Sequence, residues 1–240
     1  MSDFREPFYE KYASTFKEYI STESPEAIAS NWRKLRKKVL PLLIGYSKDA
    51  NILDLGCGPG YIMQSLRSEG FKNITGIDIS SEQIVKAKQK GLNVKVGNVF
   101  DYLILESNKY DIIIAFDFIE HFDKDELIKL IALINQTLKN GGILVIHTPN
   151  GQGMFPQKII YGDLTHLTIV TPNSLIQLLK LEGFDEIKII ESGPVAVNII
   201  GFLRLIIWKT IKILYNIIRL AETGGRDKIL TQDLFCVAKK

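Results

Sequence analysis

Cysteine and histidine are scarce in this 240-residue sequence, and long uncharged apolar runs are absent. Its two cysteines, Cys57 and Cys236, cannot build a disulfide framework or a zinc knuckle, which favours a reducing, cytoplasmic location. The first residues are charged and aromatic, so we expect no signal peptide. Because no run of about 18 uncharged apolar residues occurs, we expect no membrane-spanning helix.

A strong charge of one sign is also lacking, since 30 Lys and Arg residues against 27 Asp and Glu residues leave a net charge of +3. A net charge this small produces only a weak electrostatic field, which argues against a protein that coats nucleic acids. We therefore expect no nucleic-acid partner. The apolar share of 46% and the charged share of 24% are ordinary for a folded protein. This composition excludes an intrinsically disordered chain.

Residues 1–50 have a helical pattern. Aromatic residues recur in the first part, at Phe8, Tyr9, Tyr12, Phe16 and Tyr19. A basic run over 33–38 lies in a helix that we expect to end near residue 41, which is a proline. An aromatic helical segment of this kind is suited to close over a site and exclude water, so we interpret residues 1–50 as an N-terminal lid.

From residue 51 short apolar runs alternate with amphipathic stretches. The runs are Ile52–Leu55, Asn73–Ile77, Asn93–Val96, Asp111–Phe116 and Ile143–His147. Helices are expected between them over 61–69, 80–90 and 123–139. Near-continuous apolar strands separated by helices predict a doubly wound α/β fold with a mostly parallel sheet. A helix over 172–182, with Thr171 as its cap, and β-like runs at 186–191 and 229–238 complete the pattern.

The first run ends in a glycine-rich turn, Asp54-Leu55-Gly56-Cys57-Gly58-Pro59-Gly60, that leads directly into a helix. Glycines let the backbone turn tightly and let a ligand approach closely, and a helix N-terminus offers free N–H groups. The second run is followed by Asp78, whose carboxylate can accept hydrogen bonds from both hydroxyls of a ribose. The third is followed by a polar–apolar pair, Asn98 and Val99, and the fourth by Asp117. These positions share the sheet edge at which doubly wound folds bind ligands.

Together these features resemble the class I S-adenosylmethionine-dependent methyltransferases, whose first motif is typically (D/E)xGxGxG. The match runs from about residue 51 to 150, and the run at 229–238 extends it. The resemblance implies a Rossmann-like, seven-stranded, mostly parallel sheet whose last strand is antiparallel, with S-adenosyl-L-methionine as cofactor. An NAD-linked Rossmann enzyme is the competing interpretation, but it normally has GxGxxG, whereas Tyr61, Ile62 and Met63 follow Gly60 here.

The resemblance also assigns residues to the cofactor. The glycine loop would lie under the methionine moiety, Asp78 would hold the ribose, and Asp117 would lie near the amino group and the methyl. Asn98 stands where the family commonly has Asp, and its amide can still bond an adenine edge. The expected cofactor-binding residues are Asp54, Gly56, Cys57, Gly58, Asp78, Ile79, Asn98, Val99 and Asp117.

Two of the three histidines are candidates for acid–base chemistry. His121 follows the fourth strand in the segment 117–121, and His166 lies in a polar insertion over 151–170. Both positions are where an acceptor should enter. With Glu120 they form the predicted catalytic group. His147, near the end of the fifth strand, is expected to be a satisfied residue at the edge of the core.

A metal site is the alternative for the same segment. Asp117, Glu120 and His121 are neighbours on one helix face, and His166 would complete two oxygen and two nitrogen ligands for a divalent ion. The pattern is similar to the ExxEH…H arrangement of small-RNA 3′-end methyltransferases and some ubiquinone-pathway O-methyltransferases, which use Mg²⁺. Asp117 replaces the first Glu and is shorter by one methylene. The remaining interpretation is a polar cleft without metal.

Residues 194–224 are almost continuously apolar, with Arg204, Lys212 and Arg219 on one side of a helical projection. The pattern is typical of a helix on a membrane surface, here the inner face of the cytoplasmic membrane, or of a helix that forms a homodimer through 195–222. The sequence thus predicts a lid over 1–50 and a methyltransferase domain over 51–240. That domain would carry a substrate-loop insertion at 151–170 and an apolar helical insertion at 194–224.

The acceptor is suggested by a less specific resemblance. Residues 162–184 resemble methyltransferases of glycan and surface-polysaccharide synthesis, which implies a hydroxyl of a saccharide, a sugar-nucleotide or a lipid-linked sugar. A phenolic or prenylated quinone precursor, methylated with metal assistance, is the alternative acceptor. A non-catalytic subunit that binds a membrane or a partner is a further alternative. The intact glycine turn, Asp78 and the histidines favour an enzyme.

Overall fold

The computed structural model describes residues 4–11 and 24–240, which include one mixed sheet of seven strands. The strand order is β3-β2-β1-β4-β5-β7-β6, and only β7 runs antiparallel to its neighbours. The strands are β1 (Asn51–Leu55), β2 (Asn73–Asp78), β3 (Val94–Val96), β4 (Tyr110–Phe116), β5 (Leu138–Pro149), β6 (Asp185–Glu191) and β7 (Asp233–Lys239). The seven-stranded Rossmann-like fold predicted from the sequence is therefore confirmed.

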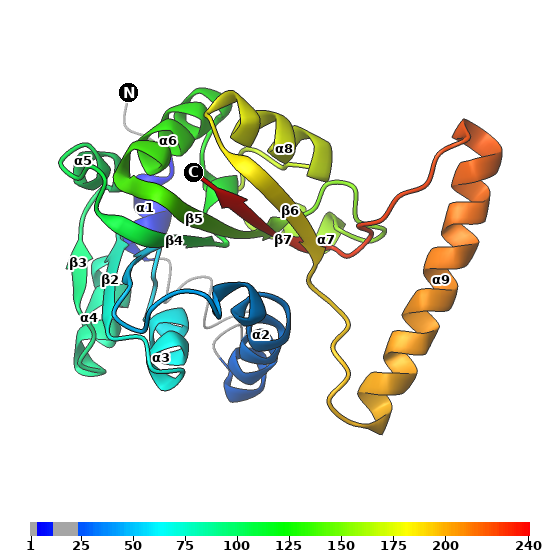
Figure 1. Cartoon of the computed structure of the whole chain (residues 1–240), viewed down its shortest axis with the longest axis horizontal. Coiled ribbons are helices and arrows are strands. Elements are labelled where there is room, and N and C mark those ends of the chain that lie inside the picture. Colours follow the sequence, from blue (N-terminus) through cyan, green and yellow to red (C-terminus); the bar gives the residue numbers. More distant parts are fainter. Residues whose placement is uncertain (1–3, 12–23) are drawn as a thin grey trace.

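Helices cover both faces of the sheet (Figure 1). One face packs against α2 (Pro25–Lys38), the short 3₁₀ helix Leu40–Leu43, α3 (Tyr61–Ser68) and α4 (Ser81–Gln89). The other packs against α5 (Val99–Leu103), α6 (Lys124–Thr137) and α8 (Pro172–Leu181). Burial of aliphatic side chains in these two layers is the main source of stability.

Helix ends follow the local sequence closely. Asp123 and Glu126 form a reciprocal capping box that begins α6, and Thr171 with Ser174 does the same for α8. The expected capping role of Thr171 is confirmed. These caps satisfy N–H groups that a helix start would otherwise leave unpaired.

Two strands begin more than one residue away from the positions predicted from the sequence. The fifth strand begins at Leu138, because the backbone turns out of α6 there and Tyr110 already pairs with Leu138. The last strand begins at Asp233 and not at Ile229. Residues 229–232 instead lie along the loop after β5, where Asn150 N–H donates to the Gln232 carbonyl and Met154 N–H to the Leu230 carbonyl.

The N-terminal residues that the structure describes form α1 (Glu6–Glu10), and the predicted aromatic positions Tyr12, Phe16 and Tyr19 lie outside the described residues. Arg5 holds this segment to the domain. Its guanidinium donates to both carboxylate oxygens of Glu126, at 2.6 and 2.7 Å, and to the His121 carbonyl at 2.8 Å. A bidentate pair of this kind fixes direction as well as distance.

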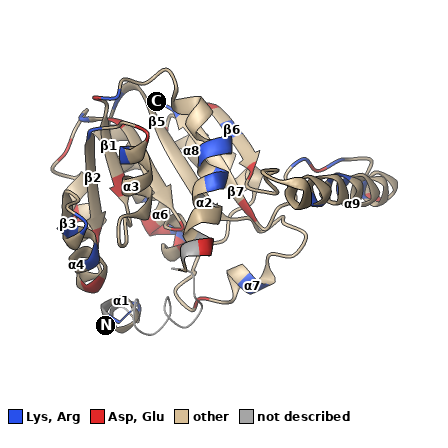
Figure 2. Ribbon diagram, turned by 90° about the horizontal axis from the view of Figure 1, so that it is seen from below, with Lys and Arg blue, Asp and Glu red and all other residues tan. Residues whose placement is uncertain are grey.

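The apolar insertion forms α9 (Ile199–Thr223), a 25-residue helix that stands apart from the sheet and its helices (Figures 1 and 2). It is joined to the body by the segments that leave β6 and enter β7. No helix among residues 4–11 and 24–240 is long and apolar enough to cross a membrane.

Candidate functional site

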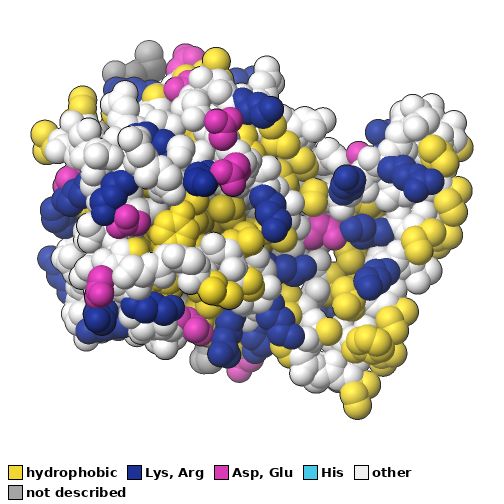
Figure 3. All heavy atoms as spheres, viewed as in Figure 1, with side chains coloured by type: hydrophobic (Ala, Val, Ile, Leu, Met, Phe, Trp, Pro, Cys, Tyr) yellow, Lys and Arg dark blue, Asp and Glu magenta, His cyan; other side chains and the backbone are white. Residues whose placement is uncertain are grey.

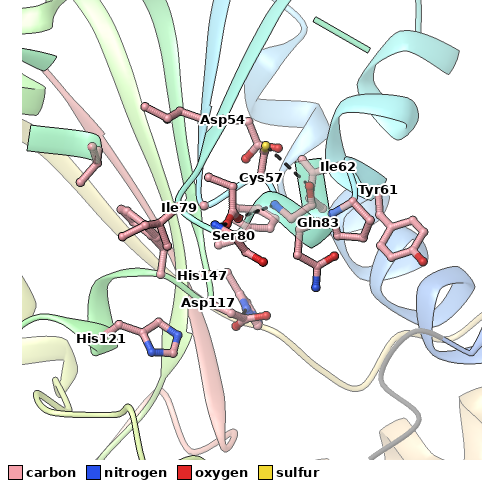
Figure 4. Close-up of a pocket in the computed structure, with 18 of the residues that line it drawn as sticks. Asp54, Cys57, Tyr61, Ile62, Ile79, Ser80, Gln83, Asp117, His121 and His147 are labelled. Atoms are coloured by element: carbon pink, nitrogen blue, oxygen red, sulfur yellow. Dashed lines mark hydrogen bonds and ion pairs between the residues drawn. The ribbon is translucent and has the colours of Figure 1, made fainter. Parts of the chain in front are cut away.

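A cavity of about 480 Å³ opens at the carboxyl ends of β1, β2 and β4 (Figure 4). We call the wall formed by residues 54–62, 77–80 and 97–99 the glycine side. The wall formed by residues 116–118, 121 and 122 with His147 and Phe235 is called the histidine side. Arg5, Tyr9, Ile28, Trp32 and Lys34 from the N-terminal segment also line the cavity, and the role of residues 1–50 as a lid stays a prediction.

The glycine side depends on left-handed backbone turns. Gly56, Gly58 and Gly60 have φ values of 64°, 51° and 79°, which residues with a Cβ adopt only at a cost. A Cβ on Gly56 would also lie 2.4 Å from the Phe118 ring, whereas one on Gly58 would meet nothing within 4 Å. Gly56 is therefore required for packing, and Gly58 leaves the loop open to a ligand.

Asp78 joins the end of β2 to the glycine loop. Its carboxylate accepts from the Gly58 N–H and from the Ser80 N–H, both at 2.8 Å. These two hydrogen bonds fix the glycine loop and the start of α4 relative to each other. The carboxylate is thus fixed in the cavity wall, at the position from which a ribose could be bound.

Asp54 is almost fully buried at the end of β1, and its Oδ2 has no hydrogen-bond partner among the described residues. Burial, together with the nearby Asp78 carboxylate, raises the pKa of Asp54 to about 8. An orphaned buried oxygen is costly unless a ligand supplies a partner. Asp54 lines the cavity, so this group fits a polar ligand bound there.

The remaining predicted cofactor residues also line the glycine side. Asn98 caps α5, since its Oδ1 accepts from the Phe100 N–H at 2.8 Å, and Val99 is buried beside it. Ile79 is 49% exposed and faces the cavity. The Cys57 thiol is buried, which raises its pKa above the ordinary range, so it is an apolar neighbour and not a nucleophile.

On the histidine side, His147 lies between two carboxylates. Its Nδ1 is 2.7 Å from Asp117 Oδ1 and its Nε2 is 3.2 Å from Asp233 Oδ2. Because ionised carboxylates only accept hydrogen bonds, both ring nitrogens carry protons. Burial opposes that charge, but the two carboxylates outweigh it and raise the pKa of His147 to about 10. The same pairing lowers the pKa of Asp233 against the effect of its burial.

His147 is expected from the sequence to have its polar groups satisfied at the edge of the core, and both ring nitrogens are paired. Its position in the cavity wall and its partner Asp233 are not predictable from the sequence. Asp233 comes from the last strand and reaches His147 because β7 pairs with β5, where His147 lies opposite Phe235. Sequence spacing carries no signal for that antiparallel register.

His121 is held by a second chain of hydrogen bonds. The Thr165 hydroxyl donates to Asp163 Oδ1 at 2.6 Å, because a carboxylate offers no proton. Thr165 Oγ1 therefore accepts from His121 Nδ1, at 2.9 Å. This assignment leaves the lone pair of His121 on Nε2, the arrangement that suits a general base. His121 lines the cavity, and Figure 4 shows its ring on the opposite wall from the glycine loop.

The structure brings together three of the four predicted metal ligands. One donor atom from each of Glu120, His121 and His166 lies within 4.8 Å of the others, and the two imidazole rings are 5.0 Å apart. Asp117 is not part of this group, because its carboxylate pairs with His147. A set of one carboxylate and two imidazoles suits Zn²⁺, Mn²⁺ or Fe²⁺ better than Mg²⁺, which prefers oxygen ligands.

Glu120 and His166 belong to this cluster but not to the cavity lining among the described residues. Glu120 is buried and accepts from the Thr148 hydroxyl at 3.1 Å; burial and the Asp117 charge raise its pKa to about 8. His166 Nδ1 lies 3.3 Å from the Ile160 carbonyl. Both residues lie next to His121.

Comparison with solved structures identifies the same architecture in several methyltransferases. An S-adenosylmethionine-dependent methyltransferase from Archaeoglobus fulgidus has a TM-score of 0.69 at 24% identity, over 93% of this chain and 99% of that one. A possible histamine N-methyltransferase from Thermotoga maritima has a TM-score of 0.66 at 13% identity, over 98% of each chain. Phosphoethanolamine N-methyltransferase 2 of Haemonchus contortus, solved with S-adenosyl-L-methionine, has a TM-score of 0.62 at 16% identity, over 97% of this chain and 60% of that one.

Similarity in sequence points the same way. Ubiquinone biosynthesis O-methyltransferases of Salmonella typhi and of an Escherichia coli strain are 28% identical over 147 and 148 residues, 53% of this chain in each case. The chain matches 60% of the length of these relatives. Residues 26–189 match the methyltransferase domain family. The chain therefore belongs to that family, which confirms the resemblance to class I S-adenosylmethionine-dependent methyltransferases and makes S-adenosyl-L-methionine the implied cofactor.

Proposed function

We propose that this chain transfers a methyl group from S-adenosyl-L-methionine to a hydroxyl of a small molecule, with His121 as the general base. The observation that carries the proposal is the cavity itself. It combines a glycine loop fixed by Asp78 with an imidazole on the opposite wall whose lone pair is directed by the Asp163–Thr165–His121 hydrogen bonds.

The cofactor, when bound, supplies a methyl group on a positively charged sulfur. We assign the glycine side to its binding: Asp78 would accept from the ribose hydroxyls, and Asn98, Val99 and Ile79 would frame the adenine. Asp54, protonated near neutral pH, would find a partner for its orphaned Oδ2. Asp117, held by the His147 cation, would accept from the amino group of the methionine moiety.

For the acceptor, transfer requires an oxygen in line with the methyl and a group that takes the hydroxyl proton. His121 Nε2 would take that proton. The Thr165 and Asp163 hydrogen bonds would hold the resulting imidazolium in place. Glu120 and His166 would position His121, and Arg5, through the His121 carbonyl and Glu126, would fasten the lid above it.

Among acceptors, the name of the sequence relatives favours a phenolic ring of the ubiquinone-precursor type. The saccharide, sugar-nucleotide or lipid-linked sugar acceptor stays a prediction from the sequence, and none of the relatives described above is named for a sugar. Metal assistance at Glu120, His121 and His166 remains the mechanistic alternative, and a non-catalytic subunit remains the alternative from another class.

Release of S-adenosylhomocysteine from purified protein tests the proposal. One acceptor panel holds catechols and prenylated phenols, and the other holds sugar nucleotides and lipid-linked sugars, each with and without EDTA. Turnover on phenols at the same rate with and without EDTA supports His121 as the base. Chelator-sensitive turnover favours the metal, turnover on sugars restores the saccharide acceptor, and cofactor binding with no turnover on either panel favours the non-catalytic subunit.

A further inference from the structure

The side of α9 that faces away from the domain is an apolar surface with one polar side chain, Thr210, whose hydroxyl donates to the Ile206 carbonyl at 3.2 Å; we call it the outer face. Its large side chains are between 44% and 80% exposed. They are Ile199, Ile200, Phe202, Leu203, Ile206, Ile207, Ile213, Leu214, Ile217, Ile218 and Leu220. At 100° per residue these positions span an arc of about 160° on the helix. Figure 3 shows them as a hydrophobic edge along the outside of α9.

The opposite side of α9 is fixed by polar contacts, so the outer face cannot turn inward. Lys212 Nζ pairs with Glu191 at 2.7 Å, and Arg219 Nε pairs with Asp227 at 3.0 Å. Asn216 accepts from the Asp227 N–H at 2.7 Å and donates to its carbonyl at 3.0 Å. The Asn198 side chain caps the start of the helix, and Gly224, with φ 70°, ends it. The outer face is thus presented over about 37 Å.

Basic side chains lie along both edges of the outer face. The helical projection places Lys209 beside Phe202 and Ile213 on one edge, and Arg204 beside Ile200 on the other. Both are exposed, and neither has an ion pair with a described residue. Glu222 is the sole acidic residue of α9, and it pairs with Arg219 at 2.9 Å. The exposed edges therefore carry positive charge.

We propose that α9 docks this chain on an anionic lipid bilayer, with the outer face in the headgroup–acyl boundary and Arg204 and Lys209 on lipid phosphates. Large apolar side chains flanked by cations on flexible stems match such a surface. A second copy of the chain fits less well. Two paired helices bury a narrower stripe than the 160° of the outer face, so part of this surface would stay exposed in a dimer. This docking is independent of the methyl-transfer proposal.

Flotation of the full chain with vesicles tests the docking. The vesicles are phosphatidylcholine alone, or phosphatidylcholine mixed with phosphatidylglycerol. Wild type is expected to float with the mixed vesicles and at least about tenfold less with phosphatidylcholine alone, since each cation near an anionic surface adds roughly 1 kcal/mol. Raising the salt concentration should weaken the mixed-vesicle binding.

Three variants separate the contributions. Ile206→Ser, Ile207→Ser and Leu214→Ser together should lower binding to both vesicles by more than about tenfold, because burial of even one such side chain is worth about that factor. Arg204→Glu with Lys209→Glu should abolish the preference for phosphatidylglycerol. The matched control is Ile104→Ser with Leu105→Ser, two aliphatic residues that are 67% and 83% exposed far from α9 in sequence, and it should bind as wild type. Circular dichroism and S-adenosylhomocysteine binding check that each variant is folded.

Three results would overturn the proposal. One is wild-type protein that stays out of the vesicle fraction in both compositions. Another is a dimer, seen by sedimentation, that the triple variant converts to monomer while vesicle binding is unchanged, which would assign the outer face to a second copy. Equal loss of binding in the control would likewise refute a role for this particular face.

Discussion

The two sides of the cavity are built in different ways. The glycine side takes its shape from backbone turns within short stretches of sequence, and its central contacts are N–H groups of Gly58 and Ser80 on Asp78. The histidine side consists of ionisable side chains from segments far apart, such as His147 with Asp233 and His121 with Thr165. The first side is suited to hold a constant ligand, and the second to adjust protons at a variable one.

The largest expected effect distinguishes base chemistry from cofactor binding. His121→Ala should lower kcat by about 10²–10⁴-fold, the usual contribution of a general base, while the Kd for S-adenosylhomocysteine stays unchanged. His166→Ala is the matched comparison. A much smaller loss of kcat in that variant supports His121 as the base, whereas equal, chelator-sensitive losses in both variants would indicate a metal. Steady-state kinetics and calorimetric binding give the two readouts.

Asp78→Ala should weaken cofactor binding at the glycine side of the cavity. Two hydrogen bonds to a charged group are lost, at about 1.5–3 kcal/mol each, so the Kd for S-adenosylhomocysteine should rise by about 100-fold or more. Asp101→Ala, an exposed carboxylate on α5, serves as control. Unchanged affinity in Asp78→Ala would refute the cofactor assignment.

Two glycine variants test which feature of the glycine side, backbone conformation or packing, contributes more to stability. Gly56→Ala adds a Cβ 2.4 Å from the Phe118 ring at a left-handed position, while Gly58→Ala adds one in open space at a similar φ. Each should lose about 1–2 kcal/mol of stability from the backbone conformation. Gly56→Ala should lose more, because Phe118 must move. Urea unfolding measures the difference, and equal stabilities would show that the ring yields without cost.

The charge on the histidine side can be tested through the pH dependence of stability. Since the pKa of His147 is raised above its unfolded value near 6.5, its stabilisation is fully present below about pH 6.5 and is lost as the pH rises towards 10. Asp233, whose pKa is lowered, adds stability that is lost as the pH falls below about 4. His147→Gln should therefore unfold with roughly 1–3 kcal/mol less free energy at about pH 6, and with a smaller difference at about pH 9. An equal difference at both pH values would contradict the charged pair.

The glycine side of the cavity is predictable from the sequence to a greater extent than the histidine side, because its contacts lie within short stretches of chain. Alternating apolar runs are sufficient to predict the sheet, and the loop from Asp54 to Gly60 with Asp78 is sufficient to predict the glycine side. The pairing of Asp117 with His147, which removes Asp117 from the predicted metal group, depends on the side-chain geometry at the ends of β4 and β5. Asp233 depends on where the antiparallel strand begins, which shifted by four residues from the prediction. Local sequence patterns predict neither the Asp117–His147 pair nor the residue at which β7 begins.

The position of β7 between β5 and β6 has a consequence for the order in which the protein becomes complete. Chains emerge from the ribosome N-terminal end first, so His147 is made long before Asp233. Until β7 enters the sheet, β6 has no paired neighbour and His147 has only one of its two carboxylates. A chain still in synthesis can form the glycine side, but its histidine side is finished only by the final strand, on the far side of the α9 insertion.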